Sequence, residues 1–174
     1  MIIGFCGPIG AGKSTAAKHL VNAMGFKRLP FAGTLKAMGR AFGLTDEEVD
    51  GDRKTIPSPL LAGKTPREFM QLLGTEFGRN LIDKDVWVRA WHLSALQYPD
   101  VVADDVRFAN EVKVIHDMGG AVVRIERPGV ETSSLHASEQ QHIACDFTLL
   151  NNGAPDDLAY RVDRLYARIL NKRG

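Results

Sequence analysis

Residues 7–15, with the sequence GPIGAGKST, have the types and the spacing of a phosphate-binding loop. Four residues separate Gly7 from the triplet Gly12, Lys13 and Ser14, an apolar stretch precedes the loop, and a helical pattern follows it. Glycines let backbone N–H groups turn toward phosphate oxygens, and the start of the following helix adds partial positive charge. This predicts a bound nucleoside triphosphate, with Lys13 on its β- and γ-phosphates and Ser14 as a Mg²⁺ ligand. The expected nucleotide contacts are Gly10, Ala11, Gly12, Lys13, Ser14 and Thr15.

Acidic side chains follow a second apolar stretch, at residues 101–108 with the sequence VVADDVRF. Apolar residues that lead into aspartates at a strand end are typical of the carboxylate partner of a phosphate loop. Alternate side chains of a strand face opposite ways, so Asp104 and Asp105 cannot both point at the phosphates. The sequence leaves open which of the two serves the metal. Arg107 and Glu111 follow closely. An arginine beside an aspartate can bind a phosphate group and orient a sugar.

The order of elements that must hold these residues alternates between strand and helix. Apolar runs predict strands over 1–6, 100–105, 121–129 and 146–153 and a short extended segment at 27–33. Helical spacing predicts helices over 13–24, 34–43, 66–78, 85–96, 110–120 and 155–170, and Thr45 and Thr65 begin capping-box sequences. Such alternation predicts an α/β fold with a parallel sheet and helices on both faces, and the phosphate site at the carboxyl edge of the sheet.

Two segments carry loop signals. Residues 50–64 are rich in proline, glycine and charge, which predicts an exposed and mobile connection. Residues 130–145 are expected to form a loop with a short helix. Phosphoryl transfer requires the exclusion of water, so both 50–64 and the loop 127–142 are candidates for moving parts.

The composition narrows the class of protein. The chain has 174 residues, 44% of them hydrophobic and 25% charged, with a net charge of +1. This is the balance of one globular domain, and it favours neither a nucleic acid nor a membrane surface as partner. No apolar run approaches the roughly 18 residues of a membrane helix, and the first residues lack the pattern of a signal peptide. Cys6 and Cys145 have no metal-ligand spacing and are expected to be buried thiols in a reducing compartment.

Several motifs, taken together in their order along the chain, resemble one family. They are FAGTLK (31–36), TPREFMQLLGTEFGR (65–79), Trp87, DVRFANE (105–111) and HASE (136–139). The chain resembles the phage-type deoxynucleoside monophosphate kinases of the P-loop kinase superfamily from residue 2 to about 160. One position departs from the family pattern, which favours serine or threonine where this chain has Asp104.

The resemblance implies transfer of a phosphoryl group from ATP, with Mg²⁺, to a deoxynucleoside 5′-monophosphate. It implies a single domain (1–174) with an acceptor-binding helical region at about 33–98 and a lid at about 127–142. It also implies a cytoplasmic protein, which would lie in the host cytoplasm if a phage encodes it. Whether the protein forms a homodimer is left open. Lys13, Asp105, Arg107 and Arg127 would be catalytic, with Arg127 on the lid, and Asn152 would lie near the donor adenine. The acceptor contacts would be Leu35, Lys36, Arg53, Gly74, Thr75, Arg79, Trp87, Asp105, Arg107 and Glu111.

Three alternatives stay open from the sequence. The phosphate loop and the segment 146–153 fit a dephospho-coenzyme A kinase or another small-molecule P-loop kinase equally well, although the middle motifs differ. A nucleotide-dependent switch would require a guanine-reading segment after a late strand, and 146–153 supplies none. A nucleotide-binding module without turnover would have no use for the cluster of Asp105 and Arg107. Base preference and selection for deoxyribose depend on pocket shape, which spacing does not reveal.

Overall fold

The computed structural model describes residues 1–130 and 143–171, which form two compact units. The first unit combines Met1–Pro30 with Ser94–Gly174 and contains a sheet of five strands. The strands are β1 (Ile2–Cys6), β2 (Lys27–Arg28), β3 (Val101–Ala103), β4 (Ala121–Glu126) and β5 (Phe147–Leu150). Their order across the sheet is β2-β3-β1-β4-β5, and every neighbouring pair is parallel. The predicted α/β fold with a parallel sheet is confirmed.

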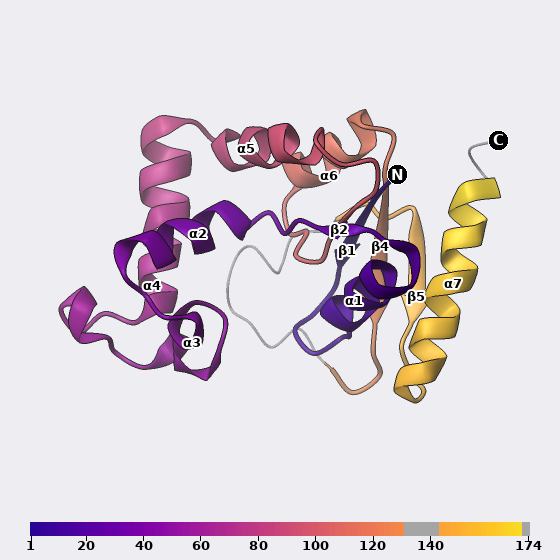
Figure 1. Cartoon of the computed structure of the whole chain (residues 1–174), viewed down its shortest axis with the longest axis horizontal. Coiled ribbons are helices and arrows are strands. Elements are labelled where there is room, and N and C mark those ends of the chain that lie inside the picture. The colour runs from indigo at the N-terminus through magenta and orange to yellow at the C-terminus, as the bar shows by residue number, and fades with distance from the viewer. Residues whose placement is uncertain (131–142, 172–174) are drawn as a thin grey trace. The chain divides into compact units, whose positions relative to one another are not determined.

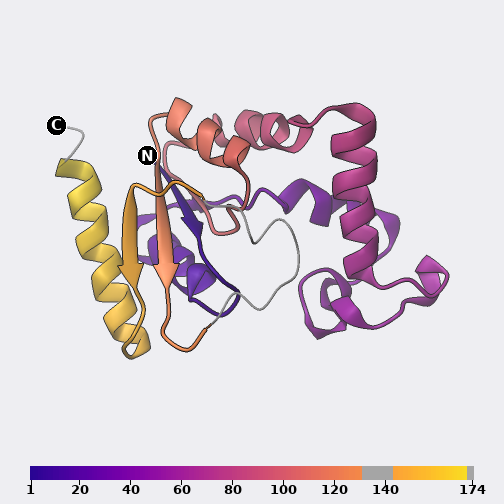
Figure 2. The same ribbon diagram turned by 180° about the vertical axis from the view of Figure 1, so that it is seen from behind.

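Helices cover both faces of this sheet. On one face, α1 (Lys13–Met24) and α7 (Pro155–Asn171) pack against each other, and α7 runs alongside β5 (Figure 1), as the reverse view also shows (Figure 2). Ile3 and Phe5 of β1 join this core together with Leu20 and Val162 of the two helices. On the other face α6 (Ala109–Asp117) packs on β1 and β4, with Ile115 fully buried. Apolar residues that alternate along β1 therefore serve both layers.

The second unit, Phe31–Leu93, is helical. It contains α2 (Gly33–Phe42), α3 (Asp46–Val49), α4 (Pro66–Gln71), the π-helical segment η3 (Leu72–Ile82) and most of α5 (Val86–Ala95). Both predicted capping boxes are present: Thr45 caps α3 and Thr65 caps α4, each with a glutamate three residues on. This unit overlaps the predicted acceptor region of about 33–98, whose binding role stays a prediction, as does the division of the chain into one domain with a lid.

The structure differs from the predicted elements in two places. The helix expected over 66–78 continues to Ile82, and its hydrogen bonding becomes π-helical from Leu72 onward. The connection 50–64, expected to be exposed and mobile, is mostly exposed, but it also contains two short 3₁₀ helices, η1 (Asp52–Thr55) and η2 (Pro59–Leu61). Leu61 is buried in a small cluster with Leu44 and Val49, and this apolar packing holds the segment in place.

Two further expectations are only partly covered by the structure. Of the predicted lid, 131–142 lie outside the described residues, as does most of the expected loop and short helix at 130–145. Within the described part of the chain, no helix has the length and apolar character needed to cross a bilayer.

Candidate active site

The phosphate loop joins β1 to α1, as predicted, and its lysine folds back over it. Lys13 Nζ donates hydrogen bonds to the carbonyl oxygens of Gly7 and Pro8, each at 2.7 Å. Gly7, Gly10 and Gly12 all have positive φ. An ammonium bound to two backbone carbonyls is held over the concave side of the loop, where a phosphate group would lie.

A buried asparagine fastens the loop from the far edge of the sheet. Asn151 follows β5, and its Nδ2 donates to the carbonyl oxygen of Ala11 at 2.8 Å. Gly12 has φ 106°, and a Cβ there would meet Asn151 Nδ2. Glycine is therefore required at position 12 both for the backbone conformation and for the approach of this amide. The sequence singled out Asn152, which is exposed, whereas its neighbour Asn151 makes the loop contact.

The aspartate that lies against the loop is Asp104. Its side chain is only 2% exposed, and Arg28 donates to both carboxylate oxygens, from Nε at 3.0 Å and from a terminal nitrogen at 2.7 Å. Burial alone would raise the pKa of Asp104, but hydrogen bonds from Arg28 and from Ser14 outweigh it and hold the pKa below its ordinary value. Asp104 is thus an ionised carboxylate beside the Ser14 hydroxyl, and Asp105 is the half-buried neighbour.

A cavity of about 320 Å³ opens above the loop. Arg127, which follows β4, lies on its wall and donates to the carbonyl oxygen of Gly10 at 3.4 Å. The predicted residues Gly10, Gly12, Lys13, Ser14, Thr15 and Arg127 line it together with Asn151, Gly153 and Leu158. All five strands are parallel, so the residues after their carboxyl ends gather at one edge of the sheet, where α/β proteins bind their ligands.

The predicted acceptor residues of the first unit lie at the start of α6. Glu111 is buried, and its Oε2 accepts from the backbone amides of Arg107 at 2.7 Å and Phe108 at 3.1 Å. This caps the helix, so Glu111 has a structural role that the sequence did not reveal. Arg107 is exposed, and contact of Asp105, Arg107 and Glu111 with an acceptor stays a prediction.

Three predicted acceptor residues of the second unit lie together. Trp87 is buried, its Nε1 donates to the carbonyl oxygen of Gly74 at 2.8 Å, and Gly74 faces the side chain of Leu35. The aromatic ring also lies directly against Gly78, where a Cβ would collide with it. This close approach explains glycine at position 78.

The other predicted acceptor residues of this unit are Lys36, Arg53, Thr75 and Arg79. Lys36 forms an ion pair with Asp50 at 2.7 Å, and Arg53 and Thr75 are exposed. Arg79 is half-buried in η3. Their contact with an acceptor stays a prediction.

The arrangement of the first unit can bind a polyanion and a divalent cation. Lys13 and Arg127 supply positive charge beside the cavity, and Ser14 with Asp104 supplies adjacent oxygen atoms, which are the ligands Mg²⁺ prefers. Two contributors were missed from the sequence, Arg28 and Asn151. Their contacts depend on strand register and on which of two adjacent asparagines turns inward, and no motif reports either.

Comparisons with known proteins show which family the chain is similar to. The family model for deoxynucleotide monophosphate kinase matches residues 63–162. A protein of Acanthamoeba polyphaga mimivirus that carries the same name is 32% identical, over 98% of this chain and 95% of its own length. The deoxynucleotide monophosphate kinase of Escherichia phage RB69 is 27% identical over 57% of this chain and 43% of its own. Among solved structures, shikimate kinase from Aquifex aeolicus covers 100% of this chain and 99% of its own, with a TM-score of 0.52 and 17% identity, which shows a shared fold.

Proposed function

This chain belongs to the deoxynucleotide monophosphate kinase family, and on that premise we propose that it transfers the γ-phosphoryl group of ATP, with Mg²⁺, to a deoxynucleoside 5′-monophosphate. The observation that carries the proposal is the joint placement of Lys13, Ser14 and Asp104 at the carboxyl edge of the parallel sheet. Phosphoryl transfer needs little covalent help from the protein, and depends on positioning and on positive charge near the transferring group.

The donor nucleotide would lie in the cavity above the phosphate loop. Lys13 would exchange its two carbonyl bonds for oxygens of the β- and γ-phosphates, a small movement because those carbonyls belong to the same loop. Arg127, which also lines the cavity, would add a second positive charge. Asn151, by holding the Ala11 carbonyl, would keep the loop amides turned toward the phosphates. Gly153 also lines the cavity, and with the adjacent Asn152 it would lie nearest the adenine.

Ser14 and Asp104 are the residues that would hold the Mg²⁺ ion. Their side chains are hydrogen-bonded to each other, and both offer oxygen. Asp104 is ionised and buried, so it is a stronger candidate than Asp105. When bound, the metal would neutralise charge that develops on the phosphate oxygens during transfer. The fit of the donor set supports Mg²⁺ as the cofactor.

The acceptor would be recognised by the residues that the family resemblance assigns. In the second unit Trp87, Gly74 and Leu35 supply an apolar surface with an ordered carbonyl, suited to a sugar or a base. Arg79, Arg53, Lys36 and Arg107 supply the positive charge that a 5′-phosphate requires. Thr75, Asp105 and Glu111 are proposed to complete the set.

We also propose a cytoplasmic location with no nucleic-acid or membrane partner, and a homodimer as the candidate oligomer.

The test is ADP release from ATP and Mg²⁺ by the purified protein, coupled to chromatographic detection of the diphosphate product. The acceptor panel contains the four common deoxynucleoside monophosphates, their ribose counterparts, dephospho-coenzyme A and no acceptor. We expect turnover with one or more deoxynucleotides and formation of the matching diphosphate. Turnover with dephospho-coenzyme A alone, or hydrolysis independent of any acceptor, would overturn the proposal.

A further inference from the structure

Arg28 makes a two-point contact with the carboxylate that faces the phosphate loop. Its Nε lies 3.0 Å from Asp104 Oδ1, and a terminal guanidinium nitrogen lies 2.7 Å from Oδ2. The Asp104 side chain is 2% exposed, whereas the Arg28 side chain is 46% exposed. The guanidinium therefore covers the carboxylate on the side that faces solvent. A fork that engages both oxygens fixes the plane of the carboxylate as well as its position.

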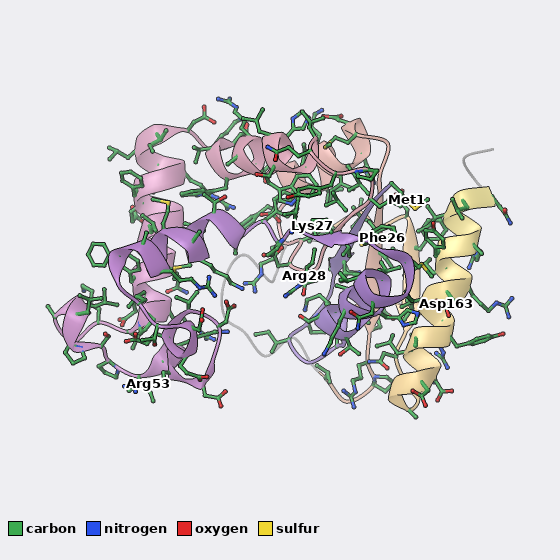
Figure 3. All side chains as sticks on the ribbon, in the orientation of Figure 1. Met1, Phe26, Lys27, Arg28, Arg53 and Asp163 are labelled. Carbon is green, nitrogen blue, oxygen red and sulfur yellow. The ribbon has the colours of Figure 1, made fainter. Side chains whose placement is uncertain are left out.

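The fold delivers Arg28 to this place through a strand of two residues. Lys27 N donates to Asp100 O at 2.8 Å, and Leu29 N donates to Val102 O at 2.9 Å, which locks β2 against β3. In this register Arg28 pairs with Val102, two residues before Asp104. Figure 3 labels Arg28 next to Lys27 on this strand. Side chains alternate along a strand, so Arg28 and Lys27 point to opposite sides, and Lys27 instead lies over the ring of Tyr98.

We propose that Arg28 is a positioning residue that holds Asp104 against Ser14 and thereby sets the affinity of the site for a divalent cation. The inference rests on the proposed function, because it takes Ser14 and Asp104 as the residues that hold the metal. A half-exposed ion pair on the surface would matter little, but here one partner is almost fully buried. Removal of the arginine leaves a buried carboxylate without its charge partner, and the carboxylate then reorients toward water. This movement separates it from Ser14.

We expect the role to be specific to metal binding. The fork on Asp104 links Arg28 to the phosphate loop, because Asp104 in turn accepts a hydrogen bond from Ser14. Partners of metal ligands commonly change metal affinity by 10- to 100-fold when they are removed. Loss of Arg28 should therefore weaken binding of the metal–nucleotide complex and leave binding of the metal-free nucleotide unchanged.

The test measures the affinity of the β,γ-imido analogue of ATP by calorimetry, once with Mn²⁺ and once with EDTA. The variants are Arg28→Met and Arg28→Lys, with Lys27→Met as the matched control on the same strand. We expect Arg28→Met to weaken binding on the order of 10-fold with Mn²⁺ and to leave binding in EDTA unchanged. Arg28→Lys should fall between Arg28→Met and the parent protein, because it restores the charge but not the fork. Lys27→Met should match the parent protein in both conditions.

A parallel measurement of turnover against Mg²⁺ concentration separates positioning from folding. Arg28→Met should raise the KM for Mg²⁺ and regain most of its kcat at saturating Mg²⁺. Equal binding with Mn²⁺ in Arg28→Met and the parent protein would overturn the inference, and so would equal losses with Mn²⁺ and with EDTA. If Arg28→Met does not fold, Arg28→Lys carries the same comparison. A parent protein that binds the Mn²⁺ complex but phosphorylates no deoxynucleotide would contradict the proposed function and leave the inference about Arg28 tested on its own.

Discussion

The side-chain amide of Asn151 donates to the carbonyl oxygen of Ala11 at 2.8 Å, so the residue that follows the last strand holds the loop that follows the first. The two residues are 140 positions apart, and both are buried. A buried carbonyl without a donor is costly, which makes this amide a structural part of the loop. The conformation of the phosphate loop therefore depends on the residue after an edge strand as well as on the loop's own motif.

Asn151→Ala should lower the free energy of unfolding by about 1–3 kcal/mol, because it leaves the buried Ala11 carbonyl without its donor. It should also weaken ATP binding, because the loop is less well held. Chemical denaturation and calorimetric titration with ATP measure the two effects. Asn152→Ala is the matched variant on the neighbouring, exposed asparagine, and its unfolding free energy should stay near that of the parent protein. A larger loss of ATP affinity in Asn152→Ala than in Asn151→Ala would favour the assignment made from the sequence.

Lys13→Ala should abolish turnover and leave the fold intact. The lysine donates to two half-buried carbonyls of its own loop and is not part of the apolar core. Loss of its charge at the transferring group should reduce kcat by at least on the order of 10²-fold. Steady-state kinetics and a melting curve measure the two properties. Lys18→Ala, on an exposed position of the same helix, is the control. Full activity in Lys13→Ala would remove the donor-site assignment.

Arg107→Ala should lower kcat/KM for the deoxynucleotide. The decrease should correspond to a loss of transition-state stabilisation on the order of 2–3 kcal/mol, with little change in the melting temperature. The side chain is exposed, and the hydrogen bond to Glu111 comes from the Arg107 backbone amide, so the substitution leaves it in place. Kinetics at varied acceptor and fixed ATP measure the effect.

Glu111→Ala tests the structural role of the neighbouring carboxylate. It removes the carboxylate that caps α6, so it should destabilise the fold by about 1 kcal/mol or more. Unchanged acceptor kinetics in Arg107→Ala would show that the arginine is a surface charge, whatever Glu111→Ala does.

Trp87→Phe should lower stability by about 0.5–1.5 kcal/mol, because it removes the hydrogen bond to Gly74 and keeps most of the ring packing. If the ring also borders the acceptor, KM for the deoxynucleotide rises while KM for ATP stays constant. Trp91→Phe is the matched control, since Trp91 stacks on Phe31 and has no predicted acceptor role. Equal changes in both variants would mean that Trp87 only packs the core.

Sequence patterns predicted the parts of this protein that local chemistry determines. The phosphate loop, both capping boxes and the strand–helix alternation each depend on residues close together in the chain. The parts that were missed depend on distant contacts. The contact of Asp104 with Ser14 depends on the way β3 lies beside the loop, and Arg28 reaches Asp104 through a strand too short to leave a periodic signal. The π-helical bonding of η3 was not foreseen either, since its composition is that of an ordinary helix.

The pair Cys6 and Cys145 gives a prediction about pH. The two sulfur atoms lie 3.1 Å apart, and Cys6 is fully buried at the end of β1. Burial, together with the hydrogen bond and the charge interaction with Cys145, raises the pKa of Cys6 to about 12.

The folded state therefore keeps this thiol protonated where the unfolded chain, with an ordinary cysteine pKa, ionises. The contribution of Cys6 to stability is complete below the unfolded pKa and is lost as pH rises toward about 12. Denaturation between pH 8 and pH 11 should show a steeper loss of stability in the parent protein than in Cys6→Ala. Parallel curves would mean that the thiol ionises as easily in the folded state as in the unfolded one.

The burial of Cys6 also predicts an order of chemical modification. In the native protein at pH 8.5, iodoacetamide should modify Cys145 before Cys6, and mass spectrometry of the digest measures this order. Modification of Cys6 before Cys145 would contradict the burial of Cys6.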